Sequence, residues 1–114
     1  MPQPKRYREQ KLSEEIRHLA AKFLTDISNR SSLITITSAT VSDDGKYATI
    51  FFTVLPEDKE TEALALLKRR RSDFKEFVKA ESRIGRIPFF DFEIDTGEKN
   101  RQNIDRLIGE DSAK

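Results

Sequence analysis

The sequence predicts a two-layer α+β domain whose helices pack on one face of a three-stranded sheet. Three observations lead to this prediction: helical apolar spacing near the N-terminus, two β-type runs around a turn signal, and a third β-type run after a second helical stretch. The expected order is helix, strand, strand, helix, kink, helix, strand. The chain has 114 residues, the size of one domain. We expect that domain to span 7–108, between a flexible N-terminal arm, 1–6, and a flexible C-terminal tail, 109–114.

The first helix is predicted from about residue 7, where apolar side chains recur at spacings of 3 and 4. They are Leu12, Ile16, Leu19, Ala20, Phe23 and Ile27. Because this spacing places them along one face, it is typical of an amphipathic helix. The polar stretch 28–32 then predicts a turn that ends the helix.

A β-hairpin is predicted next. Residues 33–42 are rich in β-branched side chains, and their apolar positions change parity near Ser38, which indicates a bulge. The Asp-Asp-Gly sequence at 43–45 is a turn signal, with Gly45 able to adopt positive φ. Residues 46–55 alternate between two faces, so we expect one face to be buried against helices.

The second helical stretch carries an interruption in its apolar face. Leu67 and Phe74 are in phase for one continuous helix, but Arg70 stands between them where an apolar residue is expected. One interpretation is a single helix whose Arg70 side chain extends to the surface. The other, which the residues favour, is two helices joined by a kink at 70–72, with Ser72 as the N-cap of the second.

A third strand is predicted at 87–95, where aromatic and acidic residues alternate and Pro88 stands near the start. Gly85 and Pro88 are expected to end the preceding helix. Residues 101–108 predict a short final helix that packs through Ile104, Leu107 and Ile108.

The composition excludes several classes of site. The chain has no cysteine, so disulfides, thiolate zinc sites and cysteine nucleophiles are excluded. No apolar run approaches the roughly 18 residues of a membrane span, and the first residues lack the apolar core of a signal peptide. We therefore expect a cytoplasmic protein with no membrane contact.

No catalytic or metal site is predicted either. His18 is the single histidine and has no patterned partner. Asp91, Glu93 and Asp95 share one strand face, but nothing around them would enclose a cation, so we interpret them as a solvated face. Without a nucleophile triad, a phosphate-binding glycine loop or an acid–base pair, we expect a protein that is not an enzyme and needs no cofactor.

The charge pattern is the strongest functional signal. The net charge is only +1, yet residues 68–86 hold eight cations against three anions. Cations beside a new helix N-terminus can bind phosphate through charge, guanidinium hydrogen bonds and the helix dipole. The alternative is a solvated basic face. The candidate RNA-binding residues are Lys68, Arg69, Arg70, Arg71, Ser72, Lys75, Lys79, Arg83 and Arg86, together with Lys5, Arg6 and Arg8 of the arm.

Further expectations concern some of these cations and one other. The last four cations of the first set, at spacings of 4, 4 and 3, would form one stripe if the helix reaches Arg86. Arg83 and Arg86 could instead pair with the acidic face of the third strand. Lys46, at the hairpin turn, is interpreted as solvated.

Three aromatic residues, Tyr47, Phe51 and Phe89, lie on the strand parity opposite their apolar neighbours. They could stack on bases, as on some RNA-binding sheets. Packing at the sheet edge is the simpler interpretation, and it is the one that we adopt from the sequence.

Three stretches together resemble the ribosome-binding factor A family. They are ITITSATVSDDGKYATIFFTVL at 34–55, SRIGRIPFFDFEID at 82–95 and RQNIDRLI at 101–108. The resemblance implies a type II K-homology (KH) fold. It also implies a factor, monomeric when free, that binds the immature small (30S) ribosomal subunit and assists late maturation of its 16S ribosomal RNA.

The chain departs from the family at one place. By resemblance, the family has an Ala-x-Gly kink between the paired helices, and Arg70-Arg71-Ser72 occupies that place here. Without glycine, positive φ is disfavoured there, so the geometry of the kink is left open. The alternative function is a KH-scaffold module for protein–protein interaction that does not contact RNA directly.

Overall fold

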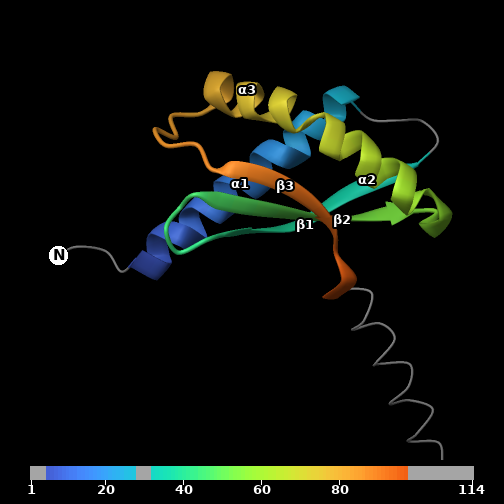
Figure 1. Cartoon of the computed structure of the whole chain (residues 1–114), viewed down its shortest axis with the longest axis horizontal. Coiled ribbons are helices and arrows are strands. Elements are labelled where there is room, and N and C mark those ends of the chain that lie inside the picture. The colour runs from blue at the N-terminus through green and yellow to red at the C-terminus, as the bar shows by residue number, and fades with distance from the viewer. Residues whose placement is uncertain (1–4, 28–31, 98–114) are drawn as a thin grey trace, which may run out of the picture.

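The computed structural model describes residues 5–27 and 32–97, and it has the element order that the sequence predicts (Figure 1). The elements are α1 (Lys5–Ile27), β1 (Leu33–Val41), β2 (Tyr47–Leu55), the 3-10 turn η1 (Glu57–Lys59), α2 (Glu60–Arg69), α3 (Arg71–Glu81) and β3 (Phe89–Ile94). The predicted α+β architecture is therefore confirmed. The predicted final helix at 101–108 and the C-terminal tail lie outside the described residues.

The sheet is mixed, with strand order β1-β2-β3. β1 and β2 form the antiparallel hairpin, and β3 adds to β2 in parallel. The register shifts between Ile36 and Ser38, which confirms the predicted bulge. The bulged Thr37 donates a hydrogen bond to the carboxylate of Asp95, so this acid just beyond β3 is tied to the far strand. Gly45 has a φ of 73°, as predicted for the hairpin turn.

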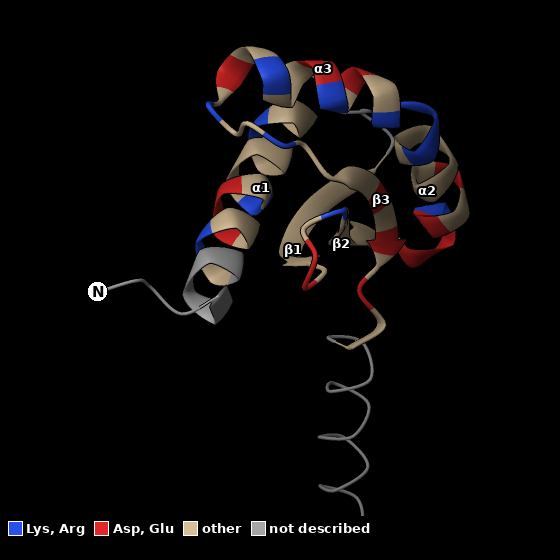
Figure 2. Cartoon of the chain, turned by 60° about the vertical axis from the view of Figure 1, so that its left-hand side comes forward, with Lys and Arg blue, Asp and Glu red and all other residues tan. Residues whose placement is uncertain are grey.

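The helices cover one face of the sheet, as Figure 2 shows from the side. Along β2 every second side chain is buried, and the residues between them are more exposed. Buried apolar side chains from the three helices and from β3 complete one core with those of β2, and partly buried residues of β1 pack against it. The buried side chains are those of Ile16, Leu19, Ala20, Phe23, Leu24, Ala48, Ile50, Phe52, Val54, Ala63, Leu67, Phe74, Val78, Phe90 and Phe92. The opposite face of the sheet is left uncovered by the described helices.

Phe74, in the first half of α3, is the aromatic centre of this core. It is fully buried, and its ring centroid lies 4.7 Å from that of Phe90, 5.3 Å from that of Phe23 and 5.8 Å from that of Phe92. These rings come from α1, α3 and β3. Phe74 therefore fixes the helix that follows the kink against both the first helix and the third strand.

The kink is present, and it does not need glycine. α2 ends at Arg69 and α3 begins at Arg71, so Arg70 is the single residue between two helices. Its φ of −97° and ψ of 9° are accessible to any L-residue, and no described residue other than glycine has positive φ. The Arg70 side chain points to the surface, where Nη1 lies 3.0 Å from Oδ2 of Asp73. An arginine fits the kink because its charged end leaves the apolar seam.

Two local predictions at the helix ends were wrong. Ser72 is not the N-cap of α3: Arg70 holds that position without a side-chain capping bond, and Ser72 is already helical and exposed. α3 also ends at Glu81, before Gly85, because Ser82 turns to extended backbone and its hydroxyl bonds to the carbonyl of Val78 at 2.8 Å. A serine that satisfies a terminal carbonyl in this way ends a helix without glycine or proline.

Within the described ranges, no helix combines the length and the apolar character that crossing a membrane requires.

Candidate nucleic-acid interface

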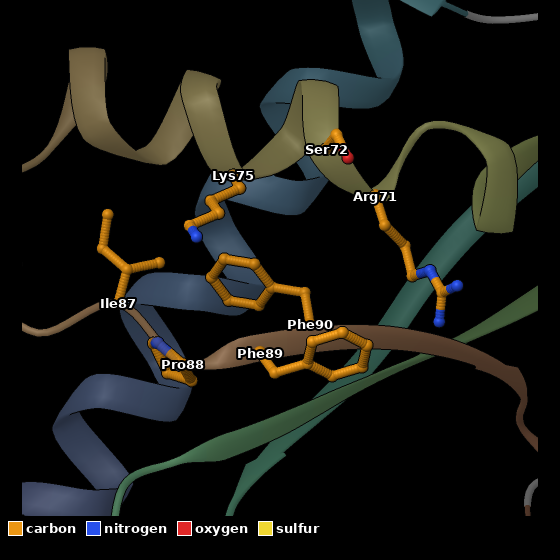
Figure 3. A pocket seen from close by; sticks show the side chains of 7 residues that line it. All are labelled: Arg71, Ser72, Lys75, Ile87, Pro88, Phe89 and Phe90. Atoms are coloured by element: carbon orange, nitrogen blue, oxygen red, sulfur yellow. The ribbon is translucent and has the colours of Figure 1, made fainter.

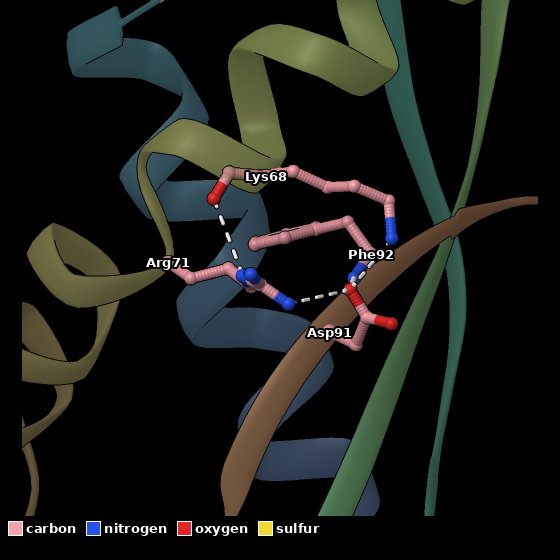
Figure 4. A network of polar contacts seen from close by, with 4 residues as sticks. All are labelled: Lys68, Arg71, Asp91 and Phe92. Carbon is pink, nitrogen blue, oxygen red and sulfur yellow. Dashed lines mark hydrogen bonds and ion pairs between the residues drawn. The ribbon is translucent and has the colours of Figure 1, made fainter.

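The basic block Lys68–Arg71 lies at the kink and is tied to β3 through Asp91 (Figure 4). Oδ1 of Asp91 lies 3.0 Å from Nζ of Lys68 and 3.3 Å from Nη1 of Arg71. The same oxygen accepts a hydrogen bond from the backbone N–H of Phe92 at 2.9 Å. Arg71 is held further by its Nε, which donates to the carbonyl of Lys68 at 3.2 Å. One carboxylate thus fixes two of the four cations in place.

The charge state of Asp91 follows from these contacts. Partial burial raises the pKa of Asp91, but the hydrogen bonds from Lys68 and the Phe92 N–H, with the charges of Lys68 and Arg71, outweigh it and hold the pKa below its usual range. Asp91 is therefore ionised at neutral pH and neutralises part of the block. The sequence-based interpretation of Asp91 as a solvated residue was wrong.

A cleft of about 400 Å³ opens beside the kink, between the first turns of α3 and the start of β3 (Figure 3). Its lining residues are Arg71, Ser72, Lys75, Ile87, Pro88, Phe89 and Phe90. Arg71 and Lys75 place positive charge on the helix side, while the strand side is apolar and aromatic. A cleft with this lining can accept a group that is flat and apolar at one end and anionic at the other.

Among the residues that the structure describes, the remaining predicted cations of 68–86 are either paired with an acid of α3 or unpaired. Lys79 lies 3.4 Å from Glu76, and Arg70 is paired with Asp73, as described above. Within the described ranges, no ion pair or side-chain hydrogen bond is found for Arg69, Lys75, Arg83 or Arg86. These four side chains belong to exposed residues.

The predicted continuous stripe of cations is not formed, because α3 ends at Glu81 and leaves Arg83 and Arg86 in the segment that leads to β3. Figure 2 shows the result: cations mark the kink and this connecting segment, and acids of α3 lie between them. The alternative pairing of Arg83 and Arg86 with the acidic strand face is not seen either. Asp91 takes its partners from the kink instead.

The other predicted cations lie in the first helix. α1 begins at Lys5, so Lys5 and Arg6, expected in the arm, belong to the helix together with Arg8. The positions of their side chains lie outside what the structure describes. His18 is exposed, and the described residues contain no group of three or more histidine or acidic side chains that could hold a metal ion.

Sequence reasoning missed parts of this site. Ile87, Pro88 and Phe90 line the cleft, although the pattern marked them only as parts of a strand. Tyr47 and Phe89 do not pack away at the sheet edge as we expected, since 60% of Tyr47 and 57% of Phe89 is exposed. The signal for their exposure was their parity, opposite to the buried Ala48 and Phe90.

Comparison with known proteins agrees with this architecture. The family described as "Ribosome-binding factor A" matches residues 8–108. The ribosome-binding factor A of Lactobacillus acidophilus is 32% identical over 100 residues, which cover 85% of this chain and 83% of that protein. The protein of the same name from Neisseria meningitidis is 27% identical over 115 residues, which cover 99% and 94%.

Two solved structures share the fold. The crystal structure of ribosome-binding factor A from Thermus thermophilus matches with a TM-score of 0.67 at 20% identity, covering 75% of this chain and 94% of that one. The solution structure of a putative ribosome-binding factor A from Thermotoga maritima gives 0.66 at 22% identity, covering 82% and 91%. A third match, with a TM-score of 0.67, 20% identity and coverage of 75% and 93%, is a homology model of the Thermus thermophilus factor as fitted into a cryo-EM map of a complex with the 30S subunit. From the family match over 8–108, this chain belongs to the ribosome-binding factor A family.

Proposed function

We propose that this protein binds the immature small ribosomal subunit and assists late maturation of its 16S ribosomal RNA by binding, without catalysis. The observation that carries the proposal is a cleft lined by Arg71 and Lys75, with further cations at the kink and in the segment that leads from α3 to β3. Family membership supports the partner, and the Thermus thermophilus relative has been placed in a 30S complex.

The contacts would be made mainly to backbone phosphates. Exposed Lys75, Arg83 and Arg86 have no partner among the described residues, so binding RNA does not require them to give up an existing ion pair. Each phosphate neutralised in this way releases counterions, which makes affinity fall steeply with salt. Phosphate contacts also orient the protein without reading sequence, so the shape of the RNA would set most of the specificity.

Binding alone can bias maturation only through a difference in affinity. If the protein binds an immature conformation of the ribosomal RNA more tightly than the mature one, it raises the population of that conformation while processing proceeds. The loss of that advantage in the mature subunit would then favour release. No bond needs to be made or broken by the protein.

The test measures binding to immature and mature small-subunit particles across a range of salt concentrations. The variant Arg83→Ala/Arg86→Ala removes two exposed cations from the segment between α3 and β3. The control, Arg17→Ala/Lys59→Ala, removes the same charge elsewhere: Arg17 of α1 is paired with Glu14, and Lys59 of η1 is paired with Glu62. We expect the first variant to make the negative slope of log K against log salt shallower by about 1.4 to 1.8, and the control to leave it nearly unchanged.

Salt-independent binding to the particles would overturn the proposal. It would favour the alternative function, a protein–protein interaction module, because counterion release would then make no contribution. Equal affinity for immature and mature particles would remove the proposed role in maturation but leave RNA binding in place.

A further inference from the structure

Tyr47 and Phe89 form an exposed pair of aromatic rings on the uncovered face of the sheet. They are register partners in the β2–β3 ladder, and the backbone N–H of Phe89 donates to the carbonyl of Lys46 at 2.8 Å. Their ring centroids lie 6.3 Å apart with an interplanar angle of 68°. The ladder holds the two residues side by side, and the rings meet edge to face, so each ring presents its own face to solvent.

Positive charge lies beside this pair. Cζ of Arg71 lies 5.4 Å from the centroid of the Phe89 ring, a cation–π contact. Phe89 and Arg71 both line the cleft, and so does Lys75, whose side chain Figure 3 shows on the helix side. The arrangement therefore combines flat aromatic surface with cations a short distance away, which is the combination that single-stranded nucleic acid binds.

We propose that Tyr47 and Phe89 are a stacking platform for an unpaired base of RNA, with Arg71 and Lys75 holding the adjoining phosphate. The inference rests on the proposed RNA-binding function and adds its substrate class, an unpaired nucleotide in a loop, bulge or end. The two rings are steeply inclined to each other, so a base stacks on one of them while the other ring packs against its edge. A base inside a duplex is stacked on its neighbours and cannot lie on either ring, so the platform selects for unpaired RNA. Stacking is tolerant of base identity, so little sequence preference is expected.

The other end of the same sheet face provides a contrast. Leu33 and Leu55 are also register partners, and 62% of Leu33 and 61% of Leu55 is exposed. The hollow beside Leu33 has a volume of about 450 Å³, and its lining residues are Ala21, Leu24, Thr25, Leu33, Ile34, Thr35 and Ile36. None of these is charged or aromatic. Exposed apolar surface occurs at both ends, but rings and cations occur together only at the Tyr47–Phe89 end of the described sheet.

This contrast supplies a matched control for the experiment. The variant Tyr47→Ala/Phe89→Ala and the control Leu33→Ala/Leu55→Ala each remove two exposed apolar side chains from one sheet face, and neither changes the charge. The full-length chain is titrated with a labelled single-stranded RNA oligonucleotide, with its duplex, and with the same strand carrying one abasic position. Circular dichroism and thermal melting confirm that each variant is folded.

We expect the aromatic variant to lose about 5- to 100-fold in affinity for the single strand. Its affinity for the duplex should be unchanged, the abasic strand should bind wild type more weakly than the intact strand, and the salt slope should stay as in wild type because no cation is removed. The leucine control should bind all three probes as wild type does. If the alanine variant does not fold, Tyr47→Leu/Phe89→Leu keeps the apolar volume and removes only the rings.

A spectroscopic test addresses the stacking directly. The chain has no tryptophan, so Tyr47→Trp introduces a single indole at the platform. Its fluorescence should be quenched by the single strand and much less by the duplex. Unchanged affinity of the ring-less variants, with an intact salt slope, would overturn the platform while RNA binding stands. Weakened binding to subunit particles but not to oligonucleotides would also overturn it, in favour of a protein contact. Absence of salt-dependent binding by wild type would instead be a failure of the proposed function itself.

Discussion

The kink and the segment after α3 are both basic in the sequence, but the fold presents their charges differently. At the kink, Lys68 and Arg71 share the carboxylate of Asp91, and Arg70 is paired with Asp73. After α3, Arg83 and Arg86 are exposed and have no ion pair within the described ranges. The denser cluster is thus the more neutralised one. The charge available to RNA depends on ion pairing as well as on the number of cations.

The two regions should therefore contribute to RNA binding in different ways. An unpaired, exposed cation can bind phosphate at the cost of its own side-chain freedom alone. A cation already held by a carboxylate must exchange that partner or share it, so its net contribution is smaller. In return, the ion pairs orient Lys68 and Arg71 toward β3 and the cleft.

The largest expected effect comes from removing the residue that supports both regions. Phe74→Ala should destabilise the protein by about 3–5 kcal/mol, because its fully buried ring packs against α1 and β3. Urea denaturation followed by circular dichroism measures the change. Phe89→Ala is the control, since 57% of Phe89 is exposed and its loss should cost much less. Equal costs for the two variants would contradict the placement of Phe74 at the centre of the core.

Removing two cations from each region in turn compares what the kink and the segment after α3 contribute to RNA binding. Arg83→Ala/Arg86→Ala should reduce the steepness of the salt dependence of RNA binding by about 1.4 to 1.8 in the slope of log K against log salt. Lys68→Ala/Arg71→Ala should lower it by less, and should also destabilise the fold because Asp91 loses both partners. The measurement is fluorescence anisotropy with one RNA at several salt concentrations. A larger loss of slope from the kink variant would show that pairing with Asp91 does not prevent Lys68 and Arg71 from binding phosphate.

A smaller effect of opposite sign is expected from Asp91→Asn. The variant releases Lys68 and Arg71 from their ion pairs with the Asp91 carboxylate. RNA affinity should therefore rise severalfold at low salt, with less gain at high salt. Asp73→Asn, which frees only the exposed Arg70, is the matched control and should produce a smaller rise. Reduced affinity in Asp91→Asn would mean that orientation by Asp91 matters more than the charge it neutralises.

The same acid predicts a pH dependence. The pKa of Asp91 is lowered in the folded state, so its stabilising contribution is fully present above its unfolded pKa of about 3.9 and is lost as the pH falls through the folded value. The stability difference between wild type and Asp91→Asn should therefore shrink on acidification below about pH 4. Chemical denaturation of both proteins at pH 7 and at acidic pH measures it. A difference that grows toward acid would contradict the direction of the pKa shift.

The smallest expected effect concerns glycine at the kink. Ser72 is helical, so Ser72→Gly should destabilise the protein by only about 0.5 kcal/mol, through the greater freedom of the unfolded chain. Denaturation with wild type alongside is sufficient to measure it. Stabilisation by glycine would show that the kink is strained with the present residues, contrary to the negative φ of Arg70.

Most of the fold could be predicted from local patterns. The alternation of 46–55 gave the buried face of β2, the parity change near Ser38 gave the bulge, and Gly45 gave the turn. The interruption at Arg70 gave the kink. Each of these features is specified by residues close together in sequence, because period, turn chemistry and backbone freedom are local properties. The helix ends were less predictable, since the serine bonds that end α3 compete with the glycine and proline signals beyond it.

The site depended on contacts between residues far apart in sequence. The sequence by itself determined which residues carry charge, where the chain bends and which strand face each ring lies on. Only the tertiary structure decided that Asp91 pairs with Lys68 and Arg71 at the kink and not with Arg83 and Arg86. It also decided that Tyr47 meets Phe89 beside Arg71. The physical reason is that Asp91 lies 20 residues from Arg71 and 23 from Lys68, so no local periodicity connects them. The docking of β3 beside β2 brings them together.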